Sequence, residues 1–230
     1  MNYLFSIAMG FLQGVAEFLP ISSSGHLTLF QYFFSPEQNP EELDMLFTIL
    51  LHFGTLISVC VYYWRDIIDM IREFFLGISD LFSRRGSHEG RPPEARRLVL
   101  MIIVGTLPLF AVLLVKDMVD AAFSNVTFIS AALIATGFLL FFSDRMAKGR
   151  KTARTATILD ALLVGCAQAV GTLPGISRAG STISAGMLCG FDRTFAVRFS
   201  FLLSLPAVLG ANILEIADAV QAGGVDMSRL

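Results

Sequence analysis

The feature that most constrains this chain is a set of apolar runs that are too long for an ordinary soluble domain. Four runs lack charged residues: Met45–Trp64, Leu98–Val115, Ala121–Ser143 and Phe199–Leu214, the last extendable at both ends. A hydrocarbon core of about 30 Å needs roughly 17–25 residues to cross as a helix. Only 16% of the residues are charged, against about a quarter in soluble domains. The sequence therefore predicts an all-α integral membrane protein with about four full transmembrane helices.

Two further apolar regions are interrupted by polar residues. The first, Tyr3–Phe34, is broken at Glu17, at Pro20 and over Ser22–His26. The second, Ala161–Phe191, is broken at Pro174–Gly175 and again over Arg178–Gly180. Each half is too short to cross a bilayer alone. We expect two re-entrant helical hairpins that enter the membrane and turn back.

The two interrupted regions are also weakly similar to each other. A shift of 155 residues aligns six identical pairs: Gly10 with Gly165, Gln13 with Gln168, Val15 with Val170, Ile21 with Ile176, Ser22 with Ser177 and Gly25 with Gly180. Similar units inserted in opposite senses form an inverted repeat, with the site where the broken segments meet. We therefore expect a single membrane domain over 1–230. Repeat 1 covers about 1–82, a cytoplasmic loop 83–95, and the core of repeat 2 about 158–217.

The basic residues predict the orientation of the chain. Seven lie in the segment Arg65–Arg97 and five in Arg145–Arg154, whereas Ser35–Leu43 has none and Lys116–Asn125 has one. By the positive-inside rule, the first two segments face the cytoplasm. The stretch Asp66–Phe82 is amphipathic, which is typical of a helix on the inner surface with a solvated charged face. A net charge of −2 argues against a nucleic-acid partner.

Charged side chains inside a bilayer are costly and commonly functional. Glu17 and Arg178 lie at equivalent ends of the two interrupted regions. If the hairpin tips meet, a carboxylate, a guanidinium and several hydroxyl groups share one pocket. The alternative is a buried ion pair that only fixes helix packing.

The residues around these charges favour phosphate chemistry. In the first tip, Ser22-Ser-Ser-Gly-His26 places hydroxyls and free backbone N–H groups at a helix start, where anions bind. His26 can transfer protons near neutral pH, and a serine beside it can be activated. In the second tip, Arg178 offers a planar set of donors suited to phosphate oxygens. Gly175 and Gly180 permit close backbone approach, and Ser177, Ser181 and Thr182 add hydroxyl groups.

These two tips resemble the signature regions of the undecaprenyl-diphosphate phosphatase (bacitracin-resistance) family. The resemblance rests on Gln13-Gly-Val-Ala-Glu17 with Phe18-Leu-Pro-Ile-Ser-Ser-Ser-Gly-His26, and on Pro174-Gly-Ile-Ser-Arg-Ala-Gly-Ser-Thr182. It implies the inverted-repeat fold and hydrolysis of undecaprenyl diphosphate to the monophosphate. That reaction recycles the lipid carrier for cell-wall synthesis and confers bacitracin resistance. The resemblance also implies a divalent cation, Mg²⁺ or Ca²⁺, and about two more helices beyond Asp218. Either the sequence is a C-terminally truncated fragment, or those helices are dispensable.

The resemblance assigns roles to individual positions. Glu17 matches the essential acid and a metal ligand, Ser23 the nucleophile, His26 the proton-transfer histidine and Arg178 the phosphate-gripping arginine. The substrate-binding positions are Gln13, Ser22, Ser24, Gly25, Ser177, Gly180 and Thr182. Gln13 stands where the family has Glu or Gln, so a second carboxylate for a metal is missing. Ala179 stands where Ser is frequent in the family.

We expect Ser23 to attack the terminal phosphorus, with His26 moving the proton and Glu17 orienting His26 or binding the cation. Direct attack by water remains an alternative mechanism. The competing function is a transporter or flippase for an anionic lipid or metabolite, since inverted repeats with broken helices are common in transporters. An inert structural subunit would not account for the intramembrane charges. We expect the lipid tail to lie near Phe201, Leu202 and Phe53. We expect His52 to be a hydrogen-bonded packing residue, with a place in the lining of the cavity as the alternative.

The expected location is the bacterial inner membrane, with several passes and an active site open to the outer face. The expected partners are the polyprenyl diphosphate substrate and the surrounding membrane lipids, and the sequence leaves a homodimer open.

Overall fold

The computed structural model describes residues 3–34, 41–83, 93–146 and 148–221, and helices carry the fold within these ranges. The helices in chain order are α1 (Tyr3–Phe18), α2 (Ser23–Phe34), α3 (Glu41–Tyr62), α4 (Trp64–Ser83), α5 (Glu94–Thr106), α6 (Leu109–Val112), the 3₁₀ helix η1 (Leu113–Val115), α7 (Lys116–Phe123), α8 (Val126–Met146), α9 (Ile158–Val170), α10 (Arg178–Leu188) and α11 (Arg193–Gln221). An isolated bridge joins Lys151 and Phe191. The expected cytoplasmic loop over 83–95 lies mostly outside the described residues.

Three of the four expected membrane spans are confirmed. Apolar helical stretches over Glu94–Phe123, Val126–Arg145 and Arg193–Ala217 are long enough to cross a bilayer. The fourth, α3, has 22 residues and an apolar part over Ile49–Tyr62, so its crossing stays a prediction. One predicted boundary was wrong, because residues 121–123 belong to α7 and the following helix begins only at Val126.

The first of these stretches is not one uniform helix. It changes from α5 to α6 around Leu107 and Pro108. Proline has no backbone N–H and cannot continue the hydrogen-bond ladder of the preceding turn. The polypeptide nevertheless resumes its helical course as far as Phe123.

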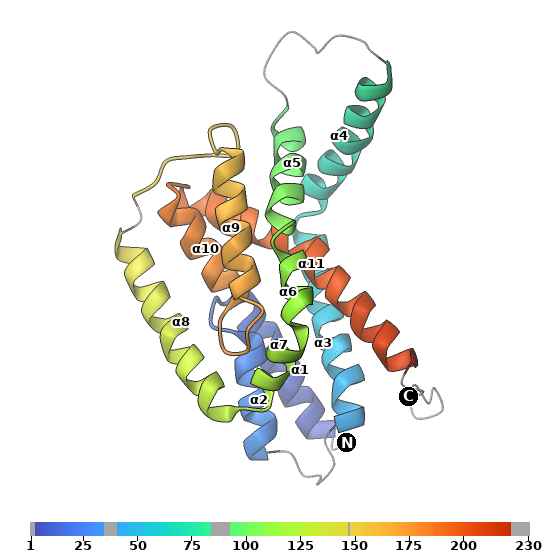
Figure 1. Cartoon of the computed structure of the whole chain (residues 1–230), viewed down its shortest axis with the longest axis vertical. Coiled ribbons are helices and arrows are strands. Elements are labelled where there is room, and N and C mark those ends of the chain that lie inside the picture. Colours follow the sequence, from blue (N-terminus) through green and yellow to red (C-terminus); the bar gives the residue numbers. More distant parts are fainter. Residues whose placement is uncertain (1–2, 35–40, 84–92, 147, 222–230) are drawn as a thin grey trace.

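The two expected hairpins are present, and they enter the molecule from opposite ends. Figure 1 shows α1 and α2 entering from the end where the N-terminus lies, and α9 and α10 entering from the end nearer α4. Helices α1, α2, α9 and α10 have 16, 12, 13 and 11 residues, fewer than a bilayer crossing needs. The bounds also follow the shift of 155, which takes Tyr3 to Ile158 and Ser23 to Arg178, the first residues of α9 and α10. The repeat and loop boundaries themselves stay predictions.

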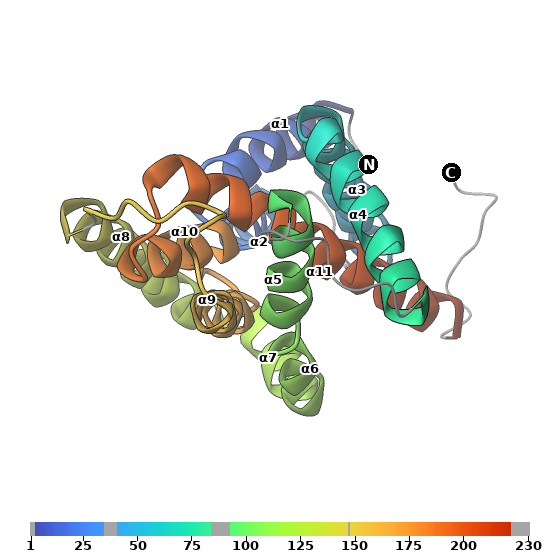
Figure 2. The ribbon, with the colours of Figure 1, turned by 90° about the horizontal axis from the view of Figure 1, so that it is seen from above.

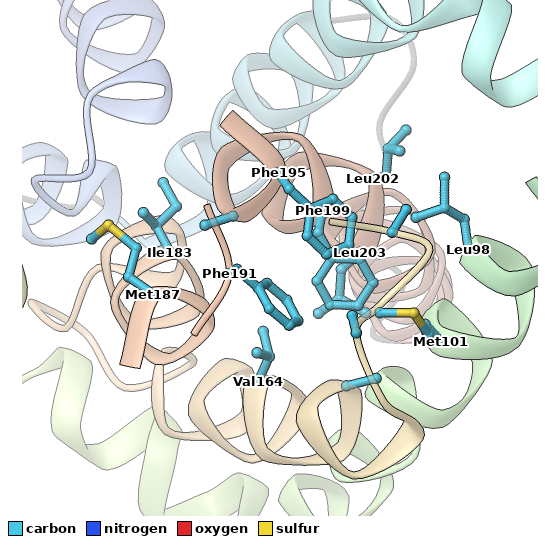
Figure 3. Packing of buried hydrophobic residues seen from close by; sticks show 14 residues of the cluster. Leu98, Met101, Val164, Ile183, Met187, Phe191, Phe195, Phe199, Leu202 and Leu203 are labelled. Carbon is cyan, nitrogen blue, oxygen red and sulfur yellow. The ribbon is translucent and has the colours of Figure 1, made fainter. Parts of the chain in front are cut away.

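The hydrophobic core surrounds the second hairpin. Figure 3 shows Phe191, Phe195 and Phe199 packed beside Val164 of α9 and Met101 of α5. Helices α5 and α9 approach closely, since a Cβ atom on Gly165 would lie only 2.2 Å from the carbonyl oxygen of Gly105. Figures 1 and 2 place α8 and α4 at opposite edges of the molecule. The core therefore holds α9 and α10 between α5, α8 and α11.

The charged face of α4 is not simply solvated, which corrects one expectation. Arg198 of α11 forms ion pairs with Asp66 of α4 and with Glu94 of α5. Arg96 of α5 donates to Glu73 at 3.1 Å and to Asp80 at 2.9 Å. Sequence periodicity identified the polar face of α4, but the helices that cover it come from distant parts of the chain. The amphipathic helix is thus tied to α5 and α11 at one end of the molecule.

Candidate active site

The tips of the two hairpins touch through glycine. A Cβ atom on Gly25 would lie 2.9 Å from the Cα atom of Gly175, and one on Gly180 would lie 2.9 Å from the carbonyl oxygen of Pro20. Such distances leave no room for a larger residue without movement of the backbone. Gly175 also has φ of +86°, a left-handed conformation that glycine adopts without strain. These positions let the two tips meet as the sequence predicted.

Glu17 joins the two hairpins chemically. Its Oε1 atom accepts a hydrogen bond from Nη2 of Arg178, forming an ion pair between residues 161 positions apart. Its Oε2 atom accepts a hydrogen bond of 2.6 Å from the Ser23 hydroxyl and one of 3.3 Å from the Gln13 amide. The side chains of Glu17 and Arg178 are only 12% and 22% exposed. A guanidinium has five N–H donors, so this contact leaves donors for phosphate oxygens.

Two helix N-termini converge on the same carboxylate. Ser23 and Arg178, which contact Glu17, are the first residues of α2 and α10. Ser22 caps α2 by accepting from the Gly25 N–H at 3.3 Å, and Ser177 caps α10 by accepting from the Gly180 N–H at 3.0 Å. The remaining first-turn N–H groups and the positive ends of both helix dipoles favour an anion at this point. In the structure the anion at this point is the Glu17 carboxylate itself.

His26 is held by its own helix. Its Nδ1 atom lies 2.8 Å from the carbonyl oxygen of Ser22. A carbonyl oxygen can only accept, so this contact assigns a proton to Nδ1, and in the neutral tautomer the lone pair would lie on Nε2. The partner differs from our expectation that Glu17 orients His26. In the structure, Glu17 instead accepts a hydrogen bond from the Ser23 hydroxyl.

Gln13 fits an oxygen ligand for a cation. The residue is 1% exposed; its Nε2 atom donates to the Glu17 carboxylate, and its Oε1 atom is buried without a hydrogen-bond partner. Among the described residues, no group of three or more His, Cys, Asp or Glu side chains could hold a metal. One carboxylate and one amide oxygen are still an adequate protein share for Mg²⁺, which often takes its other ligands from substrate phosphates and water.

The other expected site residues make contacts within the two tips or with neighbouring helices. Ser24 and Ser22 bring their hydroxyl oxygens to 3.4 Å of each other at the start of α2. Ser177 is buried, and its backbone N–H donates to Thr136 of α8. The Thr182 hydroxyl donates to the carbonyl oxygen of Arg178 and contacts Ser200 of α11. The structure thus places Thr182 behind Arg178, in the packing of α10 against α11.

Two further features lie beside this site. His52 of α3 interacts electrostatically with Glu17, which favours the alternative expected for it, a place at the cavity, over a packing role. A small opening also lies beside Glu17, lined by Thr55, Leu56 and Val59 of α3 and by Phe201, Ser204 and Val208 of α11. Phe201 was expected near the substrate tail and does line this opening. Leu202 and Phe53 were also expected there, but Leu202 is fully buried in the core and Phe53 is 47% exposed outside the lining.

Comparison with known proteins gives consistent matches along the chain. Residues 6–229 match the family model described as bacitracin resistance protein BacA. The undecaprenyl-diphosphatase of Methanosphaera stadtmanae is 40% identical over 224 residues, which cover 95% of this chain and 78% of the relative. The undecaprenyl-diphosphatase of Treponema denticola is 42% identical over 228 residues, covering 97% and 79%. That of Alkaliphilus metalliredigens is 39% identical over 219 residues, covering 95% and 78%.

Proposed function

The chain belongs to the bacitracin resistance protein BacA family, and from this premise we infer that it hydrolyses undecaprenyl diphosphate to undecaprenyl phosphate and inorganic phosphate. It is a membrane-embedded phosphatase that recycles the lipid carrier for cell-wall synthesis, an activity tied to bacitracin resistance. The observation that carries this function is the Glu17 carboxylate, contacted at once by Ser23 of one hairpin and Arg178 of the other.

The chemistry begins with anchoring of the diphosphate at the two helix N-termini. Arg178 donors and the first N–H groups of α2 and α10 bind its oxygens, and they stabilise the charge that develops in the transition state. Phosphoryl transfer depends mostly on such positioning and charge neutralisation. In this scheme the Glu17–Arg178 contact gives way to a contact between Arg178 and the terminal phosphate.

Glu17 is the proton acceptor that the geometry favours. In the first mechanism, the Ser23 oxygen forms a bond to the terminal phosphorus while the bond to the undecaprenyl phosphate oxygen breaks. The hydroxyl proton passes to Glu17, and water then hydrolyses the phosphoserine. In the second mechanism, a water held at the same place attacks directly and gives its proton to Glu17. His26, with a lone pair on Nε2, is a second proton carrier in either case.

A divalent cation, Mg²⁺ or Ca²⁺, would be held by Glu17 and by the Oε1 atom of Gln13. When bound it supplies positive charge that neutralises phosphate oxygens. The orphaned amide oxygen of Gln13 is the observation that supports this part of the proposal.

We place the protein in the bacterial inner membrane with the site open to the outer face. The two basic segments lie at one end of the molecule, since Arg154 pairs with Glu94 at 3.5 Å and Arg97 donates to the carbonyl oxygens of Ala153 and Ala156. The positive-inside rule assigns this end to the cytoplasm. The first hairpin enters from the opposite end (Figure 1). A homodimer stays a prediction.

The test of function is release of inorganic phosphate from undecaprenyl diphosphate by the purified protein in detergent. We expect turnover by the wild-type protein and a loss of roughly 100- to 1000-fold in Glu17→Gln, which removes the proton acceptor. Glu73→Gln is the matched control, because Glu73 also pairs with an arginine but lies on α4. Binding of the lipid without phosphate release would favour a transporter instead.

Experiments on the same purified protein also distinguish the covalent mechanism from direct attack by water. A phosphoserine trapped at Ser23 by acid quench supports the covalent route, and its absence together with an active Ser23→Ala variant supports attack by water.

A further inference from the structure

A group of exposed basic side chains lies where α8 ends, at the end of the molecule assigned to the cytoplasm. We call Arg145, Lys148 and Arg150 the basic patch. Within the described ranges, no carboxylate forms an ion pair with any of the three. The basic patch therefore carries positive charge that the described part of the protein does not neutralise.

The acidic residues around this connection are already engaged. Asp144 pairs with Arg193 at 2.6 Å, and Asp160 pairs with Lys151 at 2.8 Å. Asp192 accepts a hydrogen bond of 2.8 Å from a backbone N–H in the first turn of α11. A ligand that neutralises the basic patch has to come from outside these residues.

Backbone contacts hold the segment that carries the basic patch. The Lys151 N–H donates to the carbonyl oxygen of Gly190 at 2.8 Å, and the Asp192 N–H donates to that of Lys151 at 2.9 Å. A Cβ atom on Gly149 would lie 2.3 Å from the carbonyl oxygen of Phe191, so the two backbones are in close contact. The charges are thus presented on a segment fixed against the second hairpin, which lowers the ordering cost of binding a ligand.

An apolar aromatic surface continues from the basic patch along α8. Phe138 and Phe142 are 60% and 54% exposed, and their rings stack with centroids 6.4 Å apart. Arg145 follows Phe142 by three residues, so the two rings and the guanidinium share one face of the helix. The guanidinium also lies 3.4 Å from the ring centroid of Phe141. An arginine that covers a ring with its stem and keeps its charge at the end of a spanning helix is typical of the membrane interface.

We propose that this edge of α8 binds an anionic phospholipid of the inner leaflet. The phosphate of the lipid contacts the basic patch, and an acyl chain lies along Phe138 and Phe142. Charge complementarity selects a lipid with a net negative head, such as phosphatidylglycerol, over phosphatidylcholine, whose ammonium group cancels the phosphate charge. An acidic protein segment would match the charges but would leave the two rings uncovered. This site is separate from the Glu17 carboxylate, and lipid binding there does not require hydrolysis.

The test compares two double variants that remove the same charge from the same end of the molecule. Lys148→Gln with Arg150→Gln removes two charges of the basic patch. Arg65→Gln with Arg72→Gln is the control, because both residues are exposed on α4, which lies at the opposite edge (Figures 1 and 2). Native mass spectrometry of the detergent-solubilised protein gives the Kd of the first bound dioleoylphosphatidylglycerol, with dioleoylphosphatidylcholine as the neutral lipid.

We expect the Kd for phosphatidylglycerol to rise about tenfold or more in Lys148→Gln with Arg150→Gln, from roughly fivefold for each basic residue near an anionic head. The control should stay within about twofold of the wild-type protein, and binding of phosphatidylcholine should not change. Unchanged binding of phosphatidylglycerol in the patch variant would overturn the proposal. An equal loss in the α4 control would overturn it too, because net charge alone would then set the affinity.

A second variant tests the apolar half of the site. Phe138→Ala with Phe142→Ala keeps every charge and removes the aromatic surface, and we expect the Kd for phosphatidylglycerol to rise about threefold or more. Wild-type affinity in this variant would favour an acidic protein partner and would contradict a lipid site. Phosphate release is not measured in these experiments, so a failure of the proposed function would leave their outcome unaffected.

Discussion

The two hairpins share a backbone plan but differ in burial. Seven of the 11 residues of α10 are buried, whereas only Gly25 and Leu27 are buried among the 12 residues of α2. The second hairpin is enclosed by the main core, and Thr136 of α8 also holds its turn. The first hairpin leaves more of its surface open.

The hairpins also divide the chemistry between them. The shift of 155 relates Glu17 to Thr172, Ser23 to Arg178 and His26 to Ser181. Thr172 donates to the carbonyl oxygen of Ala169 in its own hairpin, and Ser181 is buried. The first hairpin therefore carries the acid, the hydroxyl and the imidazole, and the second hairpin contributes Arg178. Reactive groups held opposite a fixed guanidinium suit a reaction that depends on positioning.

The strongest test of this division removes the contribution of the buried hairpin. Arg178→Ala should lower kcat on undecaprenyl diphosphate by about 1000-fold, since it deletes donors aimed at the developing phosphate charge. Arg178→Lys should recover only part of the rate, because an ammonium lacks the planar set of donors.

Arg198→Ala is the control for Arg178→Ala. Arg198 also pairs with carboxylates, but it lies outside both hairpins, so phosphate release should persist. Near-normal turnover by Arg178→Ala would show that the second hairpin does not hold the phosphate.

The second test concerns the rigidity of the buried tip. In Gly175→Ala, a Cβ atom would lie 2.5 Å from the carbonyl oxygen of Ile129, at a residue with φ of +86°. We expect the free energy of unfolding to fall by about 2–5 kcal/mol from strain and overpacking. Gly14→Ala in the first hairpin meets nothing within 4 Å and should be neutral or slightly stabilising. Thermal unfolding in detergent measures both, and equal losses would contradict the difference in packing.

Much of the architecture could be predicted because a bilayer restricts the backbone so strongly. Spanning helices must satisfy their own hydrogen bonds, and long uncharged runs therefore predicted α8 and α11 well. The charges of Glu17 and Arg178 within broken segments identified the site for the same reason. What hydropathy cannot provide is the pairing of side chains across elements. The Ser23 hydroxyl could have faced His26 three residues away, but the turn between α1 and α2 directs it to Glu17. The meeting of the tips adds Arg178 to the same carboxylate.

The charges of α4 illustrate the same limit. Their spacing correctly predicted an amphipathic helix, but Asp66 meets Arg198, a residue 132 positions away. His52 likewise gave no local signal, because its effect on Glu17 depends on how α3 packs beside the first hairpin. Local patterns predicted the helices, and long-range packing determined their partners.

The third test removes the Thr136 hydroxyl, which bonds the turn of the second hairpin. Among the described contacts of the two tips, the first hairpin has no such bond. Thr136 donates to the carbonyl oxygen of Gly175 at 3.0 Å and accepts from the Ser177 N–H at 3.2 Å. Thr136→Val keeps the shape but leaves both backbone groups unpaired, so we expect a loss of about 1–3 kcal/mol in unfolding free energy. Ser130→Ala on the same helix is the control, because that hydroxyl bonds only its own helix. A larger loss in Ser130→Ala would refute this account of the tip.

The smallest effect on stability should come from replacing the serines that cap α2 and α10. We expect the unfolding free energy to change in opposite directions in the two hairpins. Ser22 has φ of +73°, a left-handed conformation that costs a residue with a side chain about 1–2 kcal/mol, whereas Ser177 has φ of −68°. Glycine in place of a capping serine costs only a few tenths of a kcal/mol. Ser22→Gly should therefore raise the unfolding free energy by about 1 kcal/mol through relief of strain.

Ser177→Gly has no strain to relieve and adds the backbone entropy of glycine, so it should lower stability by up to about 1 kcal/mol. Thermal unfolding of both variants, compared with the wild-type protein, measures the two changes in stability. Stability changes of the same sign in both variants would mean that Ser22 and Ser177 do not differ in backbone strain. Changes of opposite sign would show that the strain lies in the first hairpin, which carries the reactive groups. Strained residues often cluster at functional sites.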